Sequence, residues 1–323
     1  MIGTNANNAH ITSSDLRYEF AGALDRNKPA NITAPFVMEI PSTDLIPVYA
    51  FWGATPKMRE FVDERTRQNM YEYTASLGQK KWELTVDIGR DLLVYQRTSE
   101  LRDKLNALAV GINDHRDVKV QEFLNACIAA SGQTTHHKVN WEATPRSLTS
   151  RAAAPHVWGS SGNWANCLCT SANGAFSSAN LVVACKRLAA VKDDQGNLMG
   201  KRATHIGFAT NIADSVWEAL NTPTKIQASY TGDIASYVMK LGLIPVELPL
   251  LTDGYWFVAD CSGPQRPVAV VTNPNQPDEY VALTDPKDSS DVFERDVYTF
   301  GCRKVEDYWA GHPATIVGAD GVA

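Results

Sequence analysis

The sequence predicts an α+β fold, because helical and strand-like patterns occupy separate stretches of the chain. One long helical pattern spans residues 98–131 and three more lie between 178 and 241, whereas residues 243–309 read as short strands broken by glycine and proline. Of the 323 residues, 44% are hydrophobic and 20% are charged, as in a globular chain of about two domains. No stretch is apolar enough to predict a membrane-spanning helix.

The charge and the N-terminal residues exclude further classes of protein. The 30 lysines and arginines against 36 aspartates and glutamates leave a net charge of −6, which argues against a nucleic-acid binder that works through a basic surface. Residues 1–20 lack the basic and apolar regions of a secretory signal, so we expect the 6 cysteines to be free thiols. Cys127 and Cys185 fall in helical apolar patterns and are expected to be buried.

Residues 1–44 are rich in glycine, asparagine and proline, which interrupt any long periodicity. One short helix is predicted over residues 15–24, where Leu16, Phe20 and Leu24 share a face. The segment reads as an extended arm that is too polar to form its own core. It must therefore be ordered by something else or stay disordered.

Residues 45–96 are predicted to form one long excursion. It begins with a strand over 48–52 and continues with a helix that starts at Thr55-Pro56 and runs to about residue 70. Residues 81–89 then alternate strictly between polar and apolar, which is the period of a half-buried strand. Its apolar side chains form one row: Trp82, Leu84, Val86 and Ile88. We expect this row to need cover from the preceding limb or from another molecule.

The strongest helical pattern spans residues 98–131 and predicts a helix about 50 Å long at ~1.5 Å per residue. A break in the pattern at residues 113–117 predicts a kink or a surface crossing. Residues 132–176 have no assignable pattern. Three helices are predicted next, over 178–191, after a cap at Asn211, and over 233–241. The strands predicted after them are 244–251, 255–260, 267–272, 280–284 and 292–305.

Candidate catalytic residues have simpler interpretations. Gly159-Ser160-Ser161-Gly162 does not match the nucleophile-elbow spacing and is typical of a loop. His136-His137 and the Cys167-Leu-Cys169 pair could be imagined as metal ligands, but neither has the spacing of a zinc site. We therefore predict no catalytic, cofactor-binding or metal-binding residues, and a hydrolase or metalloenzyme remains a minor alternative.

Four stretches in order carry a resemblance to a known family. They are Ser42-Thr43-Asp44 with YAFWGATPKMREFVDER (Tyr49–Arg65), KWELTVDIGRDLL (Lys81–Leu93), AAVKDDQGNL (Ala189–Leu198) and VFERDVYTFG (Val292–Gly301) followed by Tyr308-Trp309. This set resembles the Mu-like phage major head subunit family. The chain departs from the family pattern in residues 132–176, which lack an expected Phe-Asp-x-x-His-Pro run.

The resemblance implies the Hong Kong 97-type capsid fold. On that basis residues 1–44 are the N-terminal arm, 45–96 the extended E-loop, 98–177 the peripheral-domain spine helix with the loop after it, 178–265 the axial domain, and 266–323 the returning peripheral strands with the C-terminal segment. It also implies a major capsid protein, without enzymatic activity, that assembles as hexamers and pentamers into an icosahedral shell enclosing double-stranded DNA.

The same resemblance implies partners, a location and a set of contacts. The expected partners are many copies of the chain itself, together with scaffold or protease, portal and decoration proteins, and no membrane or cofactor. The location is the virion, and the host cytoplasm before assembly. The expected intersubunit contacts are Trp52, Met58, Arg59, Glu60, Phe61, Val62, Asp63, Arg65, Trp82, Leu84, Val86 and Ile88. A solvated helix face is the alternative interpretation of the charges, and a non-viral encapsulating shell is the alternative function.

Overall fold

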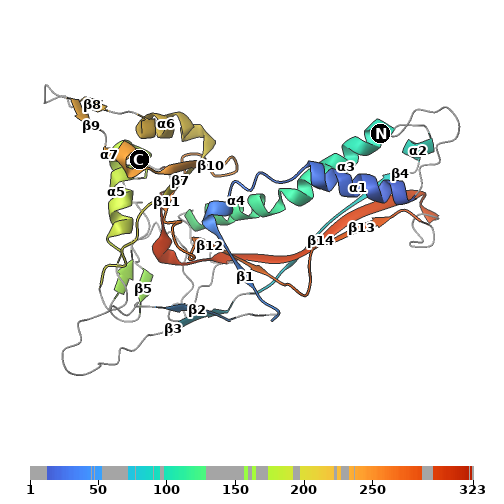
Figure 1. Cartoon of the computed structure of the whole chain (residues 1–323), viewed down its shortest axis with the longest axis horizontal. Helices are drawn as coiled ribbons and strands as arrows, with labels where there is room; N and C mark the ends of the chain where they lie inside the picture. The colour runs from blue at the N-terminus through green and yellow to red at the C-terminus, as the bar shows by residue number, and fades with distance from the viewer. Residues whose placement is uncertain are drawn as a thin grey trace. The chain divides into compact units, whose positions relative to one another are not determined.

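The computed structural model describes residues 13–44, 46, 48–52, 72–76, 78–89, 91–94, 98–128, 156–158, 162–164, 174–191, 197–221, 224–226, 233–235, 237–285, 294–319 and 321. The chain divides into two compact units, whose helices and strands are labelled in Figure 1. Unit 1 consists of residues 1–31, 80–117 and 273–306, and unit 2 of residues 32–79, 118–272 and 307–323. Each unit therefore combines segments that are distant in the sequence.

Unit 1 is built on antiparallel strands around β14 (Val297–Ala310), whose last four residues belong to unit 2. β14 pairs along residues 297–305 with β4 (Lys81–Gly89) and along residues 299–303 with β13 (Glu279–Leu283). The predicted strand over 81–89 is confirmed with the same bounds. Its strict alternation suits a strand that has one apolar face and one polar face.

Two helices cover one face of the unit 1 strands. α1 (Ser13–Arg26) packs against α3 (Thr98–Asn113), and the short α2 (Asp91–Val94) precedes α3. Phe20 of α1 meets Phe300 of β14 edge to face, with ring centroids 5.6 Å apart. The buried side chains of this core include Leu16, Phe20, Ile88, Leu101, Leu105, Leu108 and Phe300.

The N-terminal arm is ordered by the chain itself over α1. The predicted helix over 15–24 is confirmed, and over residues 13–26 the element that orders the arm is the rest of unit 1, above all α3. Leu16 and Phe20 lie four residues apart on one face of α1 and are buried in the unit 1 core, which α3 also lines. The helix is therefore stabilised by packing rather than by its own polar sequence.

The predicted long helix is two helices. α3 ends at Asn113, and α4 (His115–Ile128) begins after Asp114. The Nδ2 of Asn113 donates hydrogen bonds to the carbonyl oxygens of Leu24 and Asn27, at 2.9 and 2.6 Å, and so ties the end of α3 to the end of α1. The break falls inside the stretch where the loss of periodicity predicted a kink.

Unit 2 contains a four-stranded sheet. The strand order is β10 (Ile244–Glu247), β7 (His205–Phe208), β11 (Trp256–Ala259) and β15 (Ile316–Ala319). β10 runs parallel to β7, and the other two pairs are antiparallel. β10 and β15 are thus the two edges of this sheet.

Three helices cover one face of the unit 2 sheet. α5 (Ser178–Ala189) packs on β11 and β15, α6 (Ala213–Asn221) packs beside β10, and α7 (Tyr237–Leu241) contacts both of these helices. The side chain of Ser177 caps α5 by accepting a hydrogen bond from the Asn180 N–H. The core under the helices contains Leu181, Ala184, Leu188, Ile206, Phe208, Val216, Val238, Trp256, Val258 and Val317.

The opposite face of that sheet is also covered. β1 (Val37–Pro41) pairs in parallel with β12 (Val268–Thr272), and side chains from these strands and from α4 join a second buried core. The ring of Phe36 meets that of Phe257 with centroids 5.0 Å apart. The Phe257 ring also occupies the space that a Cβ at Gly207 would need, so glycine is required at that position.

Three two-stranded pairs and three short 3-10 helices complete the described elements. The pairs are β2 (Val48–Trp52) with β3 (Glu72–Ser76), β5 (His156–Trp158) with β6 (Gly162–Trp164), and β8 (Thr224–Ile226) with β9 (Asp233–Ala235). The 3-10 helices are η1 (Ala34–Phe36), η2 (Thr210–Ile212) and η3 (Pro313–Thr315). In the described part of the chain, no helix is long and apolar enough to cross a membrane.

Four sequence predictions were wrong in detail. β1 lies in a stretch that was predicted to be loop. It was not predicted as a strand because Pro35 and Pro41 bound the short apolar run. Residues 233–235 form a strand, so the predicted helix over 233–241 is reduced to α7. The side chain of Asn211 accepts a hydrogen bond from the Gly254 N–H instead of starting a helix directly, and β15 lies beyond the last predicted strand. The predicted helix after Thr55 lies outside the described residues.

Candidate assembly surface

The apolar row of β4 contains four of the expected intersubunit contacts. Val86 is partly buried and Ile88 is fully buried in the unit 1 core. Leu84 remains 39% exposed and lies against α3 at Gly111, where an added Cβ would stand 3.3 Å from the leucine Cδ2. The core that α3 lines therefore covers Val86 and Ile88, and the expectation that the row needs cover from the preceding limb or from another molecule is wrong for these two residues.

Trp82, the fourth member of the row, is half-buried in a polar cluster of unit 1. Its ring centroid lies 5.0 Å from that of His115, and its Nε1 donates a 2.8 Å hydrogen bond to the Glu306 carbonyl oxygen. The Glu306 carboxylate, itself only 6% exposed, lies 3.3 Å from Arg116 Nη2 and 3.7 Å from His115 Nε2. A buried carboxylate needs such partners, so this cluster fixes the first residues of α4 against β14.

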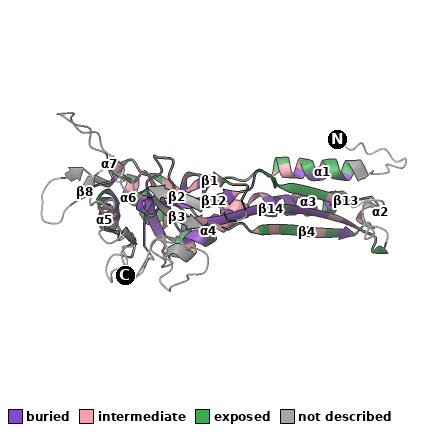
Figure 2. Ribbon diagram, turned by 90° about the horizontal axis from the view of Figure 1, so that it is seen from below, coloured by how far each residue is buried: buried purple, intermediate pink, exposed green. Residues whose placement is uncertain are grey.

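The other face of the unit 1 strands is polar. Glu83, Thr85 and Asp87 of β4 are exposed, as Figure 2 shows for most of this strand. Thr299 Oγ1 donates a 2.7 Å hydrogen bond to Asp87, and Arg303 lies 3.5 Å from Glu279. Exposed pairs of this kind contribute at most ~1 kcal/mol each, so this face is suited to solvent or to polar contacts.

The remaining predicted contacts cannot be placed as side chains. Trp52 ends β2, but the description of that strand does not extend to its side chain. The contacts predicted in the helix after Thr55 lie outside the described residues: Met58, Arg59, Glu60, Phe61, Val62, Asp63 and Arg65. The same holds for Ser160, Ser161, His136, His137, Cys167 and Cys169, which were weighed as catalytic or metal-binding residues.

The cysteines that the structure describes have the environment of core residues. Cys185, Cys261 and Cys302 are buried and free, and burial raises the pKa of each thiol to about 11. At neutral pH these thiols are protonated and weakly nucleophilic. The predicted burial of Cys185 is confirmed, whereas the Cys127 side chain lies outside the description. No group of three or more His, Cys, Asp or Glu suited to a metal ion occurs among the described residues.

Exposed apolar side chains that the sequence did not single out lie on unit 2. Trp217 of α6 is 46% exposed, Met239 of α7 is 52% exposed and Ile244 at the start of β10 is 54% exposed. Trp217 directly follows Val216, which is fully buried. Because each helical residue turns by ~100°, the residue after a fully buried Val216 points away from the core.

The family comparison agrees with this architecture. The model of the family described as "Mu-like prophage major head subunit gpT" matches residues 11–137. Over these residues the chain resembles the Mu-like prophage major head subunit family. The match contains α1, β1, β4, α3 and α4, so both units of the chain contribute to it. No curated protein matches the sequence.

Solved phage structures share the fold of this chain. The capsid chain of Ralstonia phage GP4 is 12% identical, with a TM-score of 0.56 and 92% of each chain covered. A chain of Microbacterium phage Oxtober96 is 11% identical, with a TM-score of 0.50, covering 96% of this chain and 99% of its own. These likenesses show the fold, and together with the family match they confirm the predicted α+β capsid fold and the predicted class of protein, a phage major capsid protein.

Proposed function

We propose that this chain is a head subunit that assembles as hexamers and pentamers into an icosahedral shell that encloses double-stranded DNA. The observation that carries the proposal is the family match over residues 11–137, on a chain whose fold follows a phage capsid chain over 92% of its length. The shell is a virion component, and the subunit is in the host cytoplasm before assembly. Scaffold or protease, portal and decoration proteins are the partners that such a shell requires.

The segment between β2 and β3 is the part of the predicted E-loop that we propose reaches other subunits. It contains Met58, Phe61 and Val62 as apolar candidates and Arg59, Glu60, Asp63 and Arg65 as charged ones. Trp52 at the end of β2 leads into it. On β4, Leu84 and Trp82 keep enough exposure to join such a contact, whereas Ile88 is committed to the core of its own unit.

The remaining domain assignments are part of the same proposal. α3 and α4 together take the role of the spine of the peripheral domain, and the helices and sheet between residues 178 and 265 take that of the axial domain. The net charge of −6 suits a container that repels phosphate rather than binding it, because like charges lower the affinity for a polyanion.

Assembly of the purified chain tests the proposal. Co-expression with its scaffold gene and negative-stain electron microscopy are expected to show closed shells, and light scattering is expected to report megadalton particles. DNA in particles isolated from an infected or induced host supports a head, whereas an enzyme cargo supports the non-viral shell. A chain that stays monomeric under these conditions, with scaffold present, contradicts the proposal.

A further inference from the structure

The helices of unit 2 lie at opposite edges of its sheet. α6 packs beside the edge strand β10, and α5 packs on β11 and the other edge strand, β15. α7 contacts both helices and lies between them, as Figure 1 also shows. A second molecule that approaches either edge therefore meets a different helix.

The edge at α6 and β10 is acidic and apolar. Asp214 and Glu218 are exposed on α6, which has no lysine or arginine, and Glu247 is exposed at the end of β10. Trp217 of α6 and Ile244 at the start of β10 are the apolar members, each with about half of its surface exposed. We call these five residues the acidic edge.

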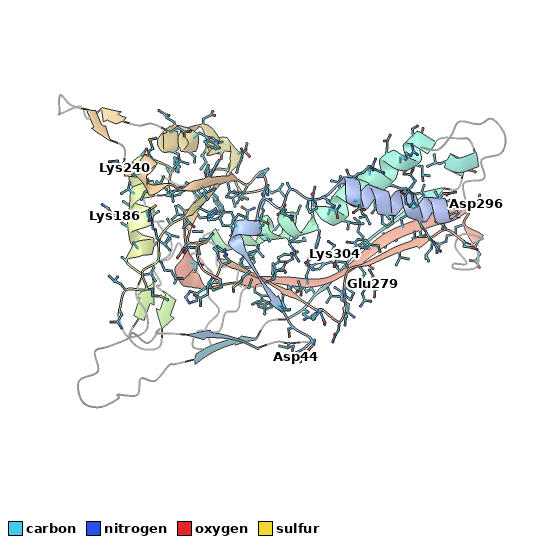
Figure 3. The ribbon with its side chains drawn as sticks, viewed as in Figure 1. Asp44, Lys186, Lys240, Glu279, Asp296 and Lys304 are labelled. Carbon is cyan, nitrogen blue, oxygen red and sulfur yellow. The ribbon has the colours of Figure 1, made fainter. Side chains whose placement is uncertain are left out.

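The edge at α5 is basic. Lys186 and Arg187 lie in the last turn of α5, which has no aspartate or glutamate, and Val183 is 39% exposed on the same helix. Lys240 of α7 is also exposed, and Figure 3 shows it with Lys186 on the same side of unit 2. These four residues form the basic edge. Among the described residues, Lys186, Lys240 and Asp214 have no ion-pair partner.

We propose that the acidic edge of one copy docks on the basic edge of the next copy around a ring. The inference rests on the proposed function, since a ring needs a subunit with two different and complementary surfaces. Two matching edges would repel each other, so the charges allow head-to-tail contact and disfavour a twofold pair through either edge. The occupant of each edge is therefore a second copy of this chain.

The exposed apolar residues provide the surface that is buried in this contact, and the charges set the orientation of the two copies. Trp217 of one copy packs on Val183 and on the aliphatic stem of Lys186 of the next copy. A lysine ammonium over an indole face adds a cation–π contact. An exposed tryptophan flanked by carboxylates is the kind of side chain that dominates protein interfaces when it is buried there.

The helix dipole is the alternative explanation for some of these charges. Acidic residues are favourable in the first turn of a helix and basic residues in the last turn, which suits Asp214 on α6 and both cations on α5. It also suits Lys240, which lies in the last turn of α7, but it does not account for the exposure of Trp217 and Ile244. The two explanations also predict different effects, because dipole effects change only the stability of the isolated subunit.

Charge-reversal variants distinguish the docking proposal from the helix-dipole explanation. Lys186→Glu or Asp214→Lys alone places like charges across the contact, and each is expected to reduce the fraction of rings and shells about fivefold, less at high salt. The double variant restores opposite charges and is expected to recover assembly to within about twofold of the original chain. Lys104→Glu is the matched control, because Lys104 is exposed on α3 of unit 1. Thermal midpoints show whether each subunit stays folded.

Mixing the two single variants tests the head-to-tail arrangement directly. One variant has a carboxylate at both positions 186 and 214 and the other has a lysine at both, so the two variants can alternate around a ring with opposite charges at each contact. Such a ring closes with six members but not with five. Mass photometry of an equal mixture is therefore expected to recover hexamers and not pentamers.

Cross-linking supplies an independent readout on the unmodified chain. Assembled particles made from a mixture of nitrogen-14 and nitrogen-15 chains are treated with a carbodiimide, which joins lysine to carboxylate. Mixed-isotope cross-links from Lys186 or Lys240 to Asp214 or Glu218 support the proposal. Their absence from particles that do form overturns it.

The outcomes distinguish this inference from the proposed function. If the original chain forms no large particles with its scaffold, the proposed function fails and the inference fails with it. If the original chain assembles and the single reversals and Trp217→Ala assemble equally well, only the inference fails. If both reversals fail but the double variant does not recover, the two edges do not meet each other and the inference is overturned.

Discussion

Unit 1 and unit 2 each contain a β-sheet, but the two sheets are covered differently. The unit 2 sheet has helices α5 to α7 on one face and the core of β1, β12 and α4 on the other. The unit 1 strands have α1 and α3 on one face, whereas the opposite face carries Glu83, Thr85, Asp87 and Arg303. A substitution on a unit 1 strand should therefore lower the free energy of unfolding strongly only on the face that the helices cover. In unit 2 it should do so on both faces of the sheet.

The largest expected effect is at Phe300 of β14, whose fully buried ring packs against Phe20 of α1. Phe300→Ala is expected to lower the free energy of unfolding by about 4 kcal/mol, because it leaves a cavity against Phe20. The neighbouring Thr299 points to the polar face, and Thr299→Ala should change it by less than about 1 kcal/mol. Urea unfolding of the unassembled subunit measures both. Similar losses for the two variants would show that the polar face is covered as well.

Two glycines in strands, one in each unit, allow the tightness of backbone packing in the two units to be compared. Gly207→Ala in unit 2 places a methyl group inside the Phe257 ring and is expected to lower the free energy of unfolding by about 3 kcal/mol. Gly301→Ala in unit 1 meets the Leu84 carbonyl oxygen and Thr85 Oγ1, both at 3.1 Å, and its expected effect is at most about 1 kcal/mol. Thermal unfolding of the two variants measures the difference. A tolerated Gly207→Ala would contradict the close packing of the unit 2 sheet.

The third effect is specific to unit 2 and depends on pH. Burial, together with the charge of Lys201, lowers the pKa of His312 from 6.5 to about 3. Between these values the unfolded chain takes up a proton that the folded chain does not, so the free energy of unfolding falls as the pH falls. The loss from pH 6.5 to pH 5 is expected to be about 2 kcal/mol.

A histidine replacement provides the control for that pH effect. In the folded chain, His312 Nδ1 accepts a 3.2 Å hydrogen bond from the Ala314 N–H. His312→Asn removes the titrating ring but keeps a side-chain acceptor for this N–H. Urea unfolding of the subunit at several pH values should show a smaller loss on acidification for this variant. An equal loss in both chains would mean that other groups carry the pH dependence.

The difference between the units also explains which parts of the fold the sequence could predict. Strand β4 was predicted with its bounds because one face is polar, so its alternation is visible in the sequence. β1 was missed because its partner β12 is more than 200 residues away and no local period marks a strand between two prolines. The cover of the β4 row by α3 was missed for the same reason, since it depends on how elements pack rather than on any one of them.

The candidate assembly surface was predictable only in part. The resemblance led to the right family, and Trp82 and Leu84 do keep some exposure. Trp217 stands next to apolar residues of α6 in the sequence, and only the packing of Val216 in the unit 2 core shows that Trp217 turns outward. The charges on α5 and α6 were visible in the sequence, but their placement at opposite edges follows from the strand order and from the strands that each helix contacts.

The smallest effect concerns the polar face of unit 1. Arg303 and Glu279 lie 3.5 Å apart on paired strands, with side chains 43% and 56% exposed. A double-mutant cycle with Arg303→Ala and Glu279→Ala should give a coupling of only about 0.5 kcal/mol in the free energy of unfolding, and less at high salt, because water screens exposed pairs. A coupling several times larger in the isolated subunit would mean that this face is shielded from solvent. If a large coupling appears only in assembled particles, the polar face of unit 1 is itself buried on assembly, and the two sheets would then be covered alike in the shell.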